Sequence, residues 1–127
     1  MLSYKFPMAY EEKSEIAKRA YNFAVQVIKI TAKLPRTPAN FILIKQVIRS
    51  ATSIGANIEE ALGGHTRNDF SYGMNVSKKE ARETRYWLRM LSDTNTVLQK
   101  ELAELLQECE ELINILTKIV KTSSIKK

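Results

Sequence analysis

The stretch from Arg49 to Leu88 reads RSATSIGANIEEALGGHTRNDFSYGMNVSKKEARETRYWL, and it decides the fold. Its first half continues a series of apolar residues at steps of three and four, which is the spacing of one face of an α-helix. The series consists of Ile44, Val47, Ile48, Ala51, Ile54, Gly55, Ile58, Ala61 and Leu62. Gly55 within this face is expected to let a neighbouring helix approach closely. The pair Gly63-Gly64 is expected to end the helix, because glycine accepts the left-handed backbone conformation.

A second helix is predicted to begin directly after the glycine pair. Thr66, followed three residues later by Asp69, is typical of a helix N-cap with its reciprocal acid. The residues beyond it form a heptad-like apolar seam of Phe70, Met74, Ser77, Ala81, Thr84, Leu88 and Leu91. The stretch therefore predicts two antiparallel helices joined by a tight turn.

The whole chain has 127 residues, a length typical of one domain. Amphipathic segments predict helices over residues 11–34, 38–63, 67–93 and 98–121. The segment Pro35–Pro38 separates the first two helices, with Thr37 as the cap of the second, and a polar turn at residues 93–96 separates the last two. Residues 1–10 are expected to form a loosely ordered arm, and residues 122–127 a frayed basic tail. The prediction is an all-α, antiparallel up-and-down four-helix bundle.

The first predicted helix is apolar over a wider surface than a helix of a monomeric bundle needs. One face consists of Ile16, Ala20, Phe23, Ala24, Val27, Ile30 and Leu34. A second face beside it consists of Ala17, Tyr21, Val25 and Ile28. Either the helix is buried on both faces within the bundle, or the second face is a contact between subunits. The sequence leaves both explanations open.

The segments RSATSIGANIEEA (residues 49–61) and KEARETRYWL (residues 79–88) resemble a family of small bacterial four-helix-bundle proteins. Some members of that family are encoded in intervening sequences of large-subunit ribosomal RNA genes. A more distant relative is the accessory variability protein of diversity-generating retroelements. The similarity covers nearly the whole chain, including ECEELI at residues 108–113. The resemblance implies a four-helix bundle without known enzymatic activity, often a ring-shaped homopentamer, with nucleic acid as a partner.

The composition favours a compact helical protein, with 44% hydrophobic residues, 4 glycines and 3 prolines. The sequence contains no run of 18 apolar residues, no secretory leader and only one cysteine, Cys109. We therefore expect no contact with the membrane and a cytoplasmic protein. The formal net charge is +6, but residues 99–117 contain five glutamates and one lysine. Such a separation of charge either steers a polyanion to one surface or orients subunits in an oligomer.

Patterns of catalytic residues are missing from the sequence. A di-metal bundle needs Glu-x-x-His pairs in its core, whereas the one histidine, His65, lies in the glycine turn. Cys109 lies in the apolar face of the last helix, where neighbouring glutamates oppose formation of a thiolate. Phosphate-binding loops of the form GxxxxGK[S/T] or GxGxxG are also absent. The sequence therefore predicts no metal site, no cofactor and no enzymatic activity.

A polar line runs beside the apolar face of the second helix, and it is spaced to meet carboxylates on the third. Buried polar groups need hydrogen-bond partners, and such partners fix the register of packed helices. We therefore predict a structural polar network made of Arg49, Ser53, Asn57, Glu60, Glu80 and Glu83. A small-ligand site at the same place is the alternative.

The third helix carries the strongest functional signal, a basic set of Arg67, Lys78, Lys79, Arg82, Arg85 and Arg89. Four of them recur at steps of three or four and form what we call the basic ridge, namely Lys78, Arg82, Arg85 and Arg89. Tyr86 and Trp87 flank the ridge and are suited to stacking on bases. The alternative is a solvated helix face whose charges are partly paired with glutamates, with Trp87 packed between helices.

The sequence thus predicts a non-catalytic, low-specificity nucleic-acid-binding or accessory protein. It would act as a homo-oligomer on RNA or DNA, with the ridge neutralising phosphates. The alternative is a structural module that self-assembles or recruits a protein partner without binding nucleic acid. Replacing Arg82, Arg85 and Arg89 with glutamine separates the two hypotheses. Loss of binding with intact assembly supports the first, and loss of assembly supports the second.

Overall fold

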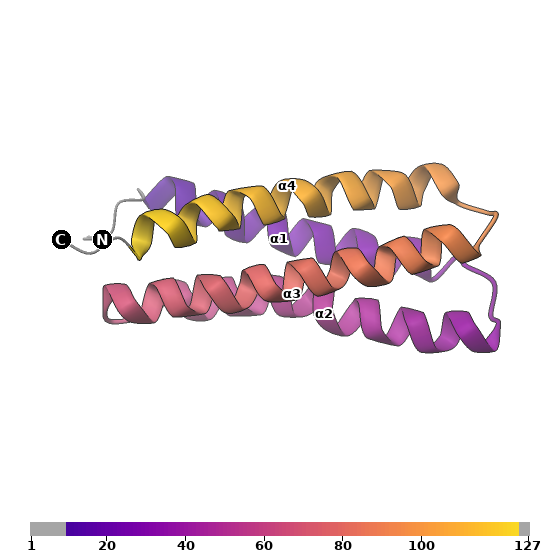
Figure 1. Cartoon of the computed structure of the whole chain (residues 1–127), viewed down its shortest axis with the longest axis horizontal. Coiled ribbons are helices and arrows are strands. Elements are labelled where there is room, and N and C mark those ends of the chain that lie inside the picture. The colour runs from indigo at the N-terminus through magenta and orange to yellow at the C-terminus, as the bar shows by residue number, and fades with distance from the viewer. Residues whose placement is uncertain (1–9, 125–127) are drawn as a thin grey trace.

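Four helices make up nearly all of the described chain. The structure, a computed structural model, describes residues 10–124. Its helices are α1 (Tyr10–Thr31), α2 (Pro38–Leu62), α3 (Arg67–Thr94) and α4 (Gln99–Ser123). They lie alongside one another and alternate in direction (Figure 1), which confirms the all-α, antiparallel up-and-down bundle. Residues 1–9 of the predicted arm and 125–127 of the predicted tail lie outside the described residues, whereas residues 122 and 123 belong to α4.

Two of the helices begin at the threonine caps that the sequence predicts. Thr37 Oγ1 accepts a hydrogen bond from the backbone N–H of Asn40 at 3.0 Å, and Pro38 occupies the first turn of α2. Thr66 Oγ1 accepts one from the backbone N–H of Asp69 at 2.9 Å and caps α3. No side chain caps α4, which is preceded by Leu98 in the left-handed conformation at a φ of 60°.

The end of α1 differs from the prediction in position, and the end of α2 differs in backbone conformation. α1 ends at Thr31 rather than at Leu34, because the Leu34 N–H donates to Thr31 O at 3.1 Å in a turn tighter than that of an α-helix. α2 does end at the glycine pair, but the expected left-handed glycine is wrong. Gly63 has a φ of −89°, and no glycine among residues 10–124 has a positive φ. Its N–H instead donates to Glu60 O at 3.1 Å and tightens the last turn.

The core is built from the predicted apolar faces. All seven residues of the α3 seam are buried, and so is Cys109 on α4. On α2, Ile54 and Ile58 are fully buried, whereas Ile44 and Ile48 are only half-buried. Each fully buried side chain of this size contributes about 1.5–3 kcal/mol to stability relative to an exposed one.

A glycine does allow two helices to approach closely, but it is Gly73 of α3 and not Gly55 of α2. A Cβ atom added at Gly73 would lie 2.8 Å from Ala61 Cβ, closer than two carbon atoms pack. α2 and α3 are also the most closely packed pair of helices. At Gly55 the nearest atom to an added Cβ is Ala20 Cβ at 3.6 Å, an ordinary van der Waals distance. The expected role of Gly55 is therefore wrong, because the space beside it accepts a methyl group.

A buried pair of amides joins the first turn of α2 to the residue that follows α3. Asn40 Nδ2 donates to Asn95 Oδ1 at 2.8 Å, and Asn95 Nδ2 donates to Asn40 Oδ1 at 3.0 Å. Asn40 Nδ2 also donates to Pro35 O at 2.8 Å. The two asparagines are 3% and 9% exposed, so water does not replace a missing partner easily.

We expect Asn40→Ala to lower the free energy of unfolding by about 2 kcal/mol, because it leaves the buried Asn95 Oδ1 and Pro35 O without their donor. Urea denaturation measures the change. Asn57→Ala on the same helix is the control, since Asn57 Nδ2 bonds only to Ser53 O of its own helix. The control variant is expected to be neutral or slightly stabilised, because alanine has the higher helix propensity. Equal effects of the two substitutions would contradict a structural role for the amide pair.

Candidate nucleic-acid interface

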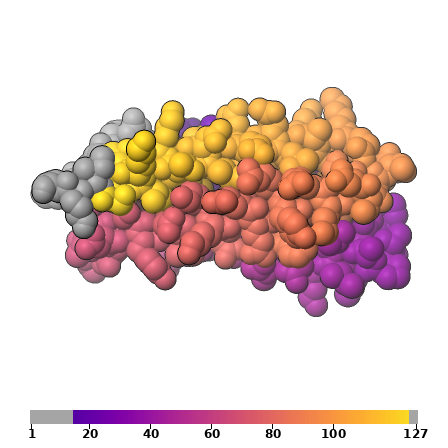
Figure 2. Space-filling view, in the orientation of Figure 1, coloured from indigo at the N-terminus to yellow at the C-terminus, as the bar shows by residue number. Residues whose placement is uncertain are grey.

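The basic ridge lies on the side of α3 next to α4. Figure 2 shows α3 and α4 side by side on the surface turned toward the viewer. Arg85 fixes this orientation, since its Nη1 lies 3.2 Å from Glu110 Oε1 on α4. Arg82 and Arg89 are exposed, and Lys78 is half-buried. Within residues 15–124, the ion pairs and side-chain hydrogen bonds involve none of these three. Three of the four ridge cations are thus available to an anionic ligand.

The two other residues of the basic set lie in different surroundings. Lys79 is exposed and adjoins the ridge. Arg67, at the start of α3, donates from Nε to Ser123 O at 2.9 Å and from Nη2 to Thr122 O at 3.4 Å. A cation at this position satisfies carbonyl groups that the end of α4 leaves without intrahelical partners. Arg67 is therefore engaged in joining α3 to α4 and stands apart from the ridge.

The two aromatic residues that flank the ridge differ in exposure. Tyr86 is 48% exposed and lies four residues after Arg82 and three before Arg89. Trp87 is half-buried against the core, and its Nε1–H donates to Glu83 Oε2 at 3.0 Å. The two rings make an edge contact with centroids 5.1 Å apart. Tyr86 is therefore positioned for stacking on a base, whereas Trp87 packs between helices.

The acidic side chains of α4 are turned mainly away from the ridge. Arg19 of α1 donates to Glu108 at 2.9 and 2.8 Å and to Glu111 at 3.1 Å. These hydrogen bonds, first that of Glu108 and then that of Glu111, hold the pKa of Arg19 above its usual range. Glu101 and Glu104 line a groove on the same side, between α1 and α4. Glu110 is the α4 carboxylate that reaches the ridge, so the positive charge there is only partly neutralised.

The structure brings together three of the six residues of the predicted polar network. Arg49 Nη2 bonds to Glu83 Oε2, and its Nη1 lies 3.6 Å from Glu80 Oε1. Ser53 and Asn57 bond instead to backbone carbonyls of their own helix, at 2.8 Å each. Glu60 is exposed and, within the described part of the chain, makes no hydrogen bond to α3.

The deeply buried polar contacts between α2 and α3 involve Ser50, which lies on the polar line beside the apolar face of α2, and the hydroxyl-bearing residues Ser77 and Thr84 of the α3 seam. Thr84 Oγ1 donates to Ser50 Oγ at 2.8 Å, and Ser77 Oγ donates to Ile54 O at 2.8 Å. All three hydroxyl-bearing residues are fully buried. The sequence did offer a signal for these contacts. Ser77 and Thr84 carry hydroxyl groups at seam positions, and a buried hydroxyl group needs a hydrogen-bond partner.

Cys109 is buried among the helices, and its thiol donates to Ala81 O at 3.2 Å. Burial raises the pKa of the thiol from 9.0 to about 12, with Glu110 and Glu108 acting in the same direction and Arg85 opposing them. The thiol thus stays protonated in the folded state, which suits a core residue and opposes nucleophilic chemistry.

We expect alkylation of Cys109 at pH 8 to be at least about 100-fold slower in the folded protein than in urea, since only the thiolate reacts and the thiol is buried. The raised pKa also has a consequence for stability. The stabilisation that comes from keeping the Cys109 thiol protonated is fully present below pH 9. It is lost as the pH rises toward 12, because only the unfolded state loses the thiol proton between these pH values. Rapid alkylation without denaturant would contradict the burial of Cys109.

Neither a metal site nor a membrane span is found in the described chain. Among residues described, no group of three His, Cys, Asp or Glu side chains is arranged to hold a metal ion. His65 is exposed in the turn between α2 and α3. The helices of residues 10–124 include none that is long and apolar enough to cross a membrane.

The four described helices place the chain among small all-α four-helix-bundle proteins. Residues 12–118 match the family described as 23S rRNA-intervening sequence protein, and the chain belongs to that family. A solved structure of a protein with unknown function, from the S23 ribosomal protein family of Bacteroides thetaiotaomicron, is 34% identical in sequence. The alignment covers 87% of this chain and 98% of that chain, with a TM-score of 0.78. No curated protein matches the chain significantly.

Proposed function

We propose that the protein is a non-catalytic nucleic-acid-binding protein of low sequence specificity. The main support is the basic ridge, where Lys78, Arg82 and Arg89 have no ion-pair partner within residues 15–124. Glutamates of α4 that would neutralise it are turned toward α1. If the ridge were only a solvated helix face, its cations would be paired with neighbouring glutamates.

The ridge binds by neutralising phosphates. It extends over about 16 Å of α3, long enough to follow several phosphates of one strand. Binding releases condensed counterions, which supplies affinity without reading base edges. Tyr86, between Arg82 and Arg89, adds stacking on an unpaired base. We therefore expect RNA loops and single strands to bind more tightly than duplex DNA.

The proposed protein acts as a homo-oligomer. One ridge holds four cations, so a single copy binds weakly at physiological salt. Several copies in one assembly bind the same polyanion together and gain affinity through effective concentration. The pentamer implied by the family resemblance stays a prediction.

Fluorescence anisotropy with labelled structured RNA, single-stranded DNA and duplex DNA tests the proposal. We expect micromolar or tighter binding at low salt that depends little on base sequence. No binding of any of the three nucleic acids at about 50 mM salt would rule out phosphate contacts by the ridge.

A protein-interaction module is the second candidate, favoured by apolar side chains exposed on α1 and α2. Tyr21 is 69% exposed, Ile28 45% and Phe41 66%. Exposed apolar patches of this kind mark interaction sites on soluble proteins. An assembly that forms normally but binds no nucleic acid would support this candidate.

A further inference from the structure

One side of the bundle, where α1 lies beside α2, carries an exposed apolar surface with a lysine rim. Phe41, Ile48 and Gly55 recur at steps of seven along one side of α2, and Gly55 lies against the backbone of Tyr21. We call the surface made by Tyr21, Val25, Ile28 and Phe41 the apolar face. The sequence left open whether the bundle buries both apolar faces of α1. It does not bury the second face, because Tyr21 and Ile28 are exposed.

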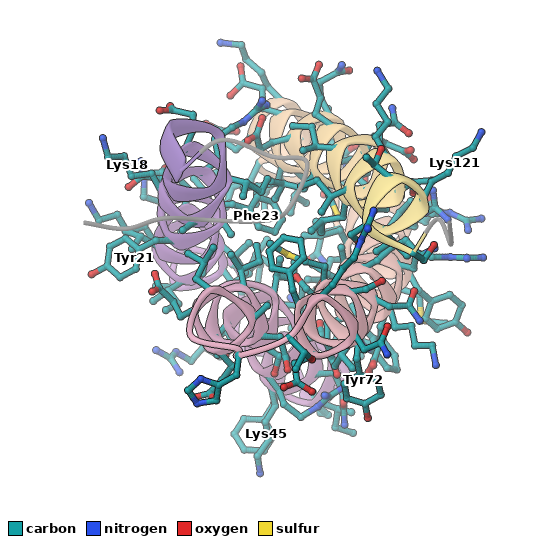
Figure 3. The ribbon with its side chains drawn as sticks, turned by 90° about the vertical axis from the view of Figure 1, so that its left-hand side faces the viewer. Lys18, Tyr21, Phe23, Lys45, Tyr72 and Lys121 are labelled. Atoms are coloured by element: carbon teal, nitrogen blue, oxygen red, sulfur yellow. The ribbon has the colours of Figure 1, made fainter. Side chains whose placement is uncertain are left out.

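Exposed lysines surround the apolar face. Lys45 Nζ lies 5.8 Å from the centre of the Phe41 ring. Figure 3 shows Lys18 and Tyr21 pointing away from the core on the same side of α1. Lys29, one turn after Val25, is also exposed. A partner for this face therefore has an apolar centre and a negative rim.

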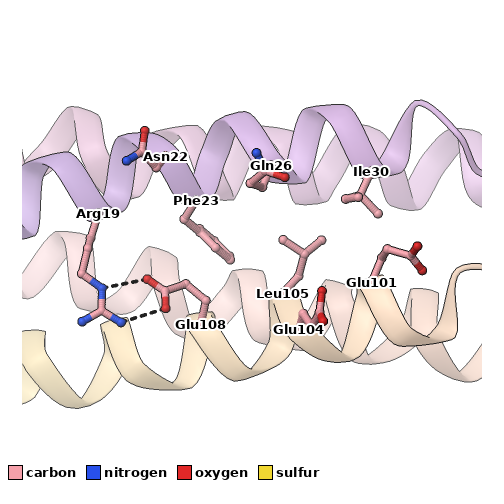
Figure 4. Close-up of a pocket in the computed structure, with 9 residues that line it drawn as sticks. All are labelled: Arg19, Asn22, Phe23, Gln26, Ile30, Glu101, Glu104, Leu105 and Glu108. Carbon is pink, nitrogen blue, oxygen red and sulfur yellow. Dashed lines mark hydrogen bonds and ion pairs between the residues drawn. The ribbon is translucent and has the colours of Figure 1, made fainter.

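The adjacent side of the bundle, where α1 lies beside α4, has that complementary chemistry. α1 and α4 are the least closely packed of the neighbouring helices, and a groove of about 360 Å³ opens between them. Figure 4 shows Phe23 and Leu105 between the two helices, with Glu101, Glu104 and Glu108 on the α4 side. Arg19 pairs with Glu108 and Lys100 pairs with Glu104, whereas Glu101 has no ion pair within the described residues. The groove thus combines apolar side chains with one unpaired carboxylate, that of Glu101, beside two glutamates that are already paired.

We propose that the apolar face of one copy of the chain docks in the α1–α4 groove of the next copy. An apolar face meeting its own equivalent would bring two lysine rims together, and this repulsion disfavours a two-fold symmetric contact. The contact is therefore between two different surfaces. Because both surfaces border α1, successive copies are rotated relative to one another, and such a contact can close into a ring. The ridge on α3 belongs to neither surface and stays accessible in each copy. This inference rests on the oligomer of the proposed function and identifies its contacts.

Sedimentation velocity without nucleic acid tests the docking with two variants. The face variant, Tyr21→Glu with Phe41→Glu, places carboxylates opposite the glutamates of the groove. The groove variant, Glu101→Lys with Glu104→Lys, places lysines opposite the lysine rim. We expect the wild-type chain to sediment as an oligomer and each variant to sediment as a monomer. The side chains of the face variant are exposed, and circular dichroism checks that both variants remain folded.

Mixing the two variants gives the sharpest result. Each mixed pair retains one intact apolar face and one intact groove, so we expect the two variants to associate when mixed although each is a monomer alone. A wild-type monomer would overturn the proposal, and so would a groove variant that keeps the oligomer, or a mixture that stays monomeric. Charge reversal of the rim, Lys18→Glu with Lys45→Glu, repeats the test if the face variant unfolds. The anisotropy assay on the same proteins separates this outcome from nucleic-acid binding, since all variants retain the ridge.

Discussion

Replacing Lys78, Arg82 and Arg89 with glutamine is expected to weaken RNA binding by about 100-fold or more at low salt, because three phosphate contacts per copy are lost. Thermal stability and oligomer size should not change. Arg82 and Arg89 are exposed, and glutamine keeps much of the aliphatic part of the half-buried Lys78. Fluorescence anisotropy measures the affinity, and circular dichroism measures the melting temperature.

The matched control removes the same charge from elsewhere on the molecule. Lys33, Arg36 and Lys118 are exposed, and none of them forms an ion pair within the described residues. Their replacement with glutamine should reduce affinity only slightly, since long-range attraction falls but no contact is lost. Equal losses for the two triple variants would show that binding follows net charge and not the ridge. Loss of assembly in the ridge variant would instead make these residues part of a subunit contact.

Gly73→Ala is expected to lower the free energy of unfolding by about 2 kcal/mol, because the new methyl group overlaps Ala61 and forces α2 and α3 apart. Its Cβ would meet Ala61 Cβ at 2.8 Å and Ala61 Cα at 3.2 Å, and neither atom belongs to a flexible side chain that moves aside. Urea denaturation at a fixed protein concentration measures the change, since oligomerisation makes stability depend on concentration.

Gly55→Ala is the matched substitution on α2 and should have the opposite sign. An added Cβ meets Ala20 Cβ at 3.6 Å, so the methyl group fits. We expect a gain of up to about 1 kcal/mol, because alanine is the better helix former. Similar destabilisation by both substitutions would mean that α1 also approaches α2 too closely for a side chain.

Local features of the sequence were sufficient to predict the bundle. Thr37 and Thr66 cap their helices as expected, because a cap involves residues only three apart. The α3 seam is buried in full, since helical spacing alone determines which residues share a face. The ends of α1 and α2 could not be predicted in the same way, because they depend on the hydrogen bonding and dihedral angles of the last turn. Glycine permits a left-handed conformation without requiring it.

Contacts between distant segments could not be predicted in this way. Asn40 and Asn95 are 55 residues apart, and the partners of Arg19 and Arg67 lie on a helix at the other end of the chain. Which glycine lies at the tightest crossing also depends on how α2 and α3 are paired in register. The ridge spacing was visible in the sequence, but the pairing of Arg85 and the side of α4 that carries its glutamates needed the tertiary structure.

The most direct test of nucleic-acid binding is the salt dependence of the association constant for the wild-type chain and the ridge variant. If the ridge contacts phosphates, the logarithm of the constant for single-stranded RNA falls linearly with the logarithm of salt concentration. We expect a slope of about −2 for each bound copy, from the three available cations, and the loss of nearly all of this slope in the ridge variant. Binding with no salt dependence, or with the same slope in both proteins, would contradict phosphate neutralisation by α3.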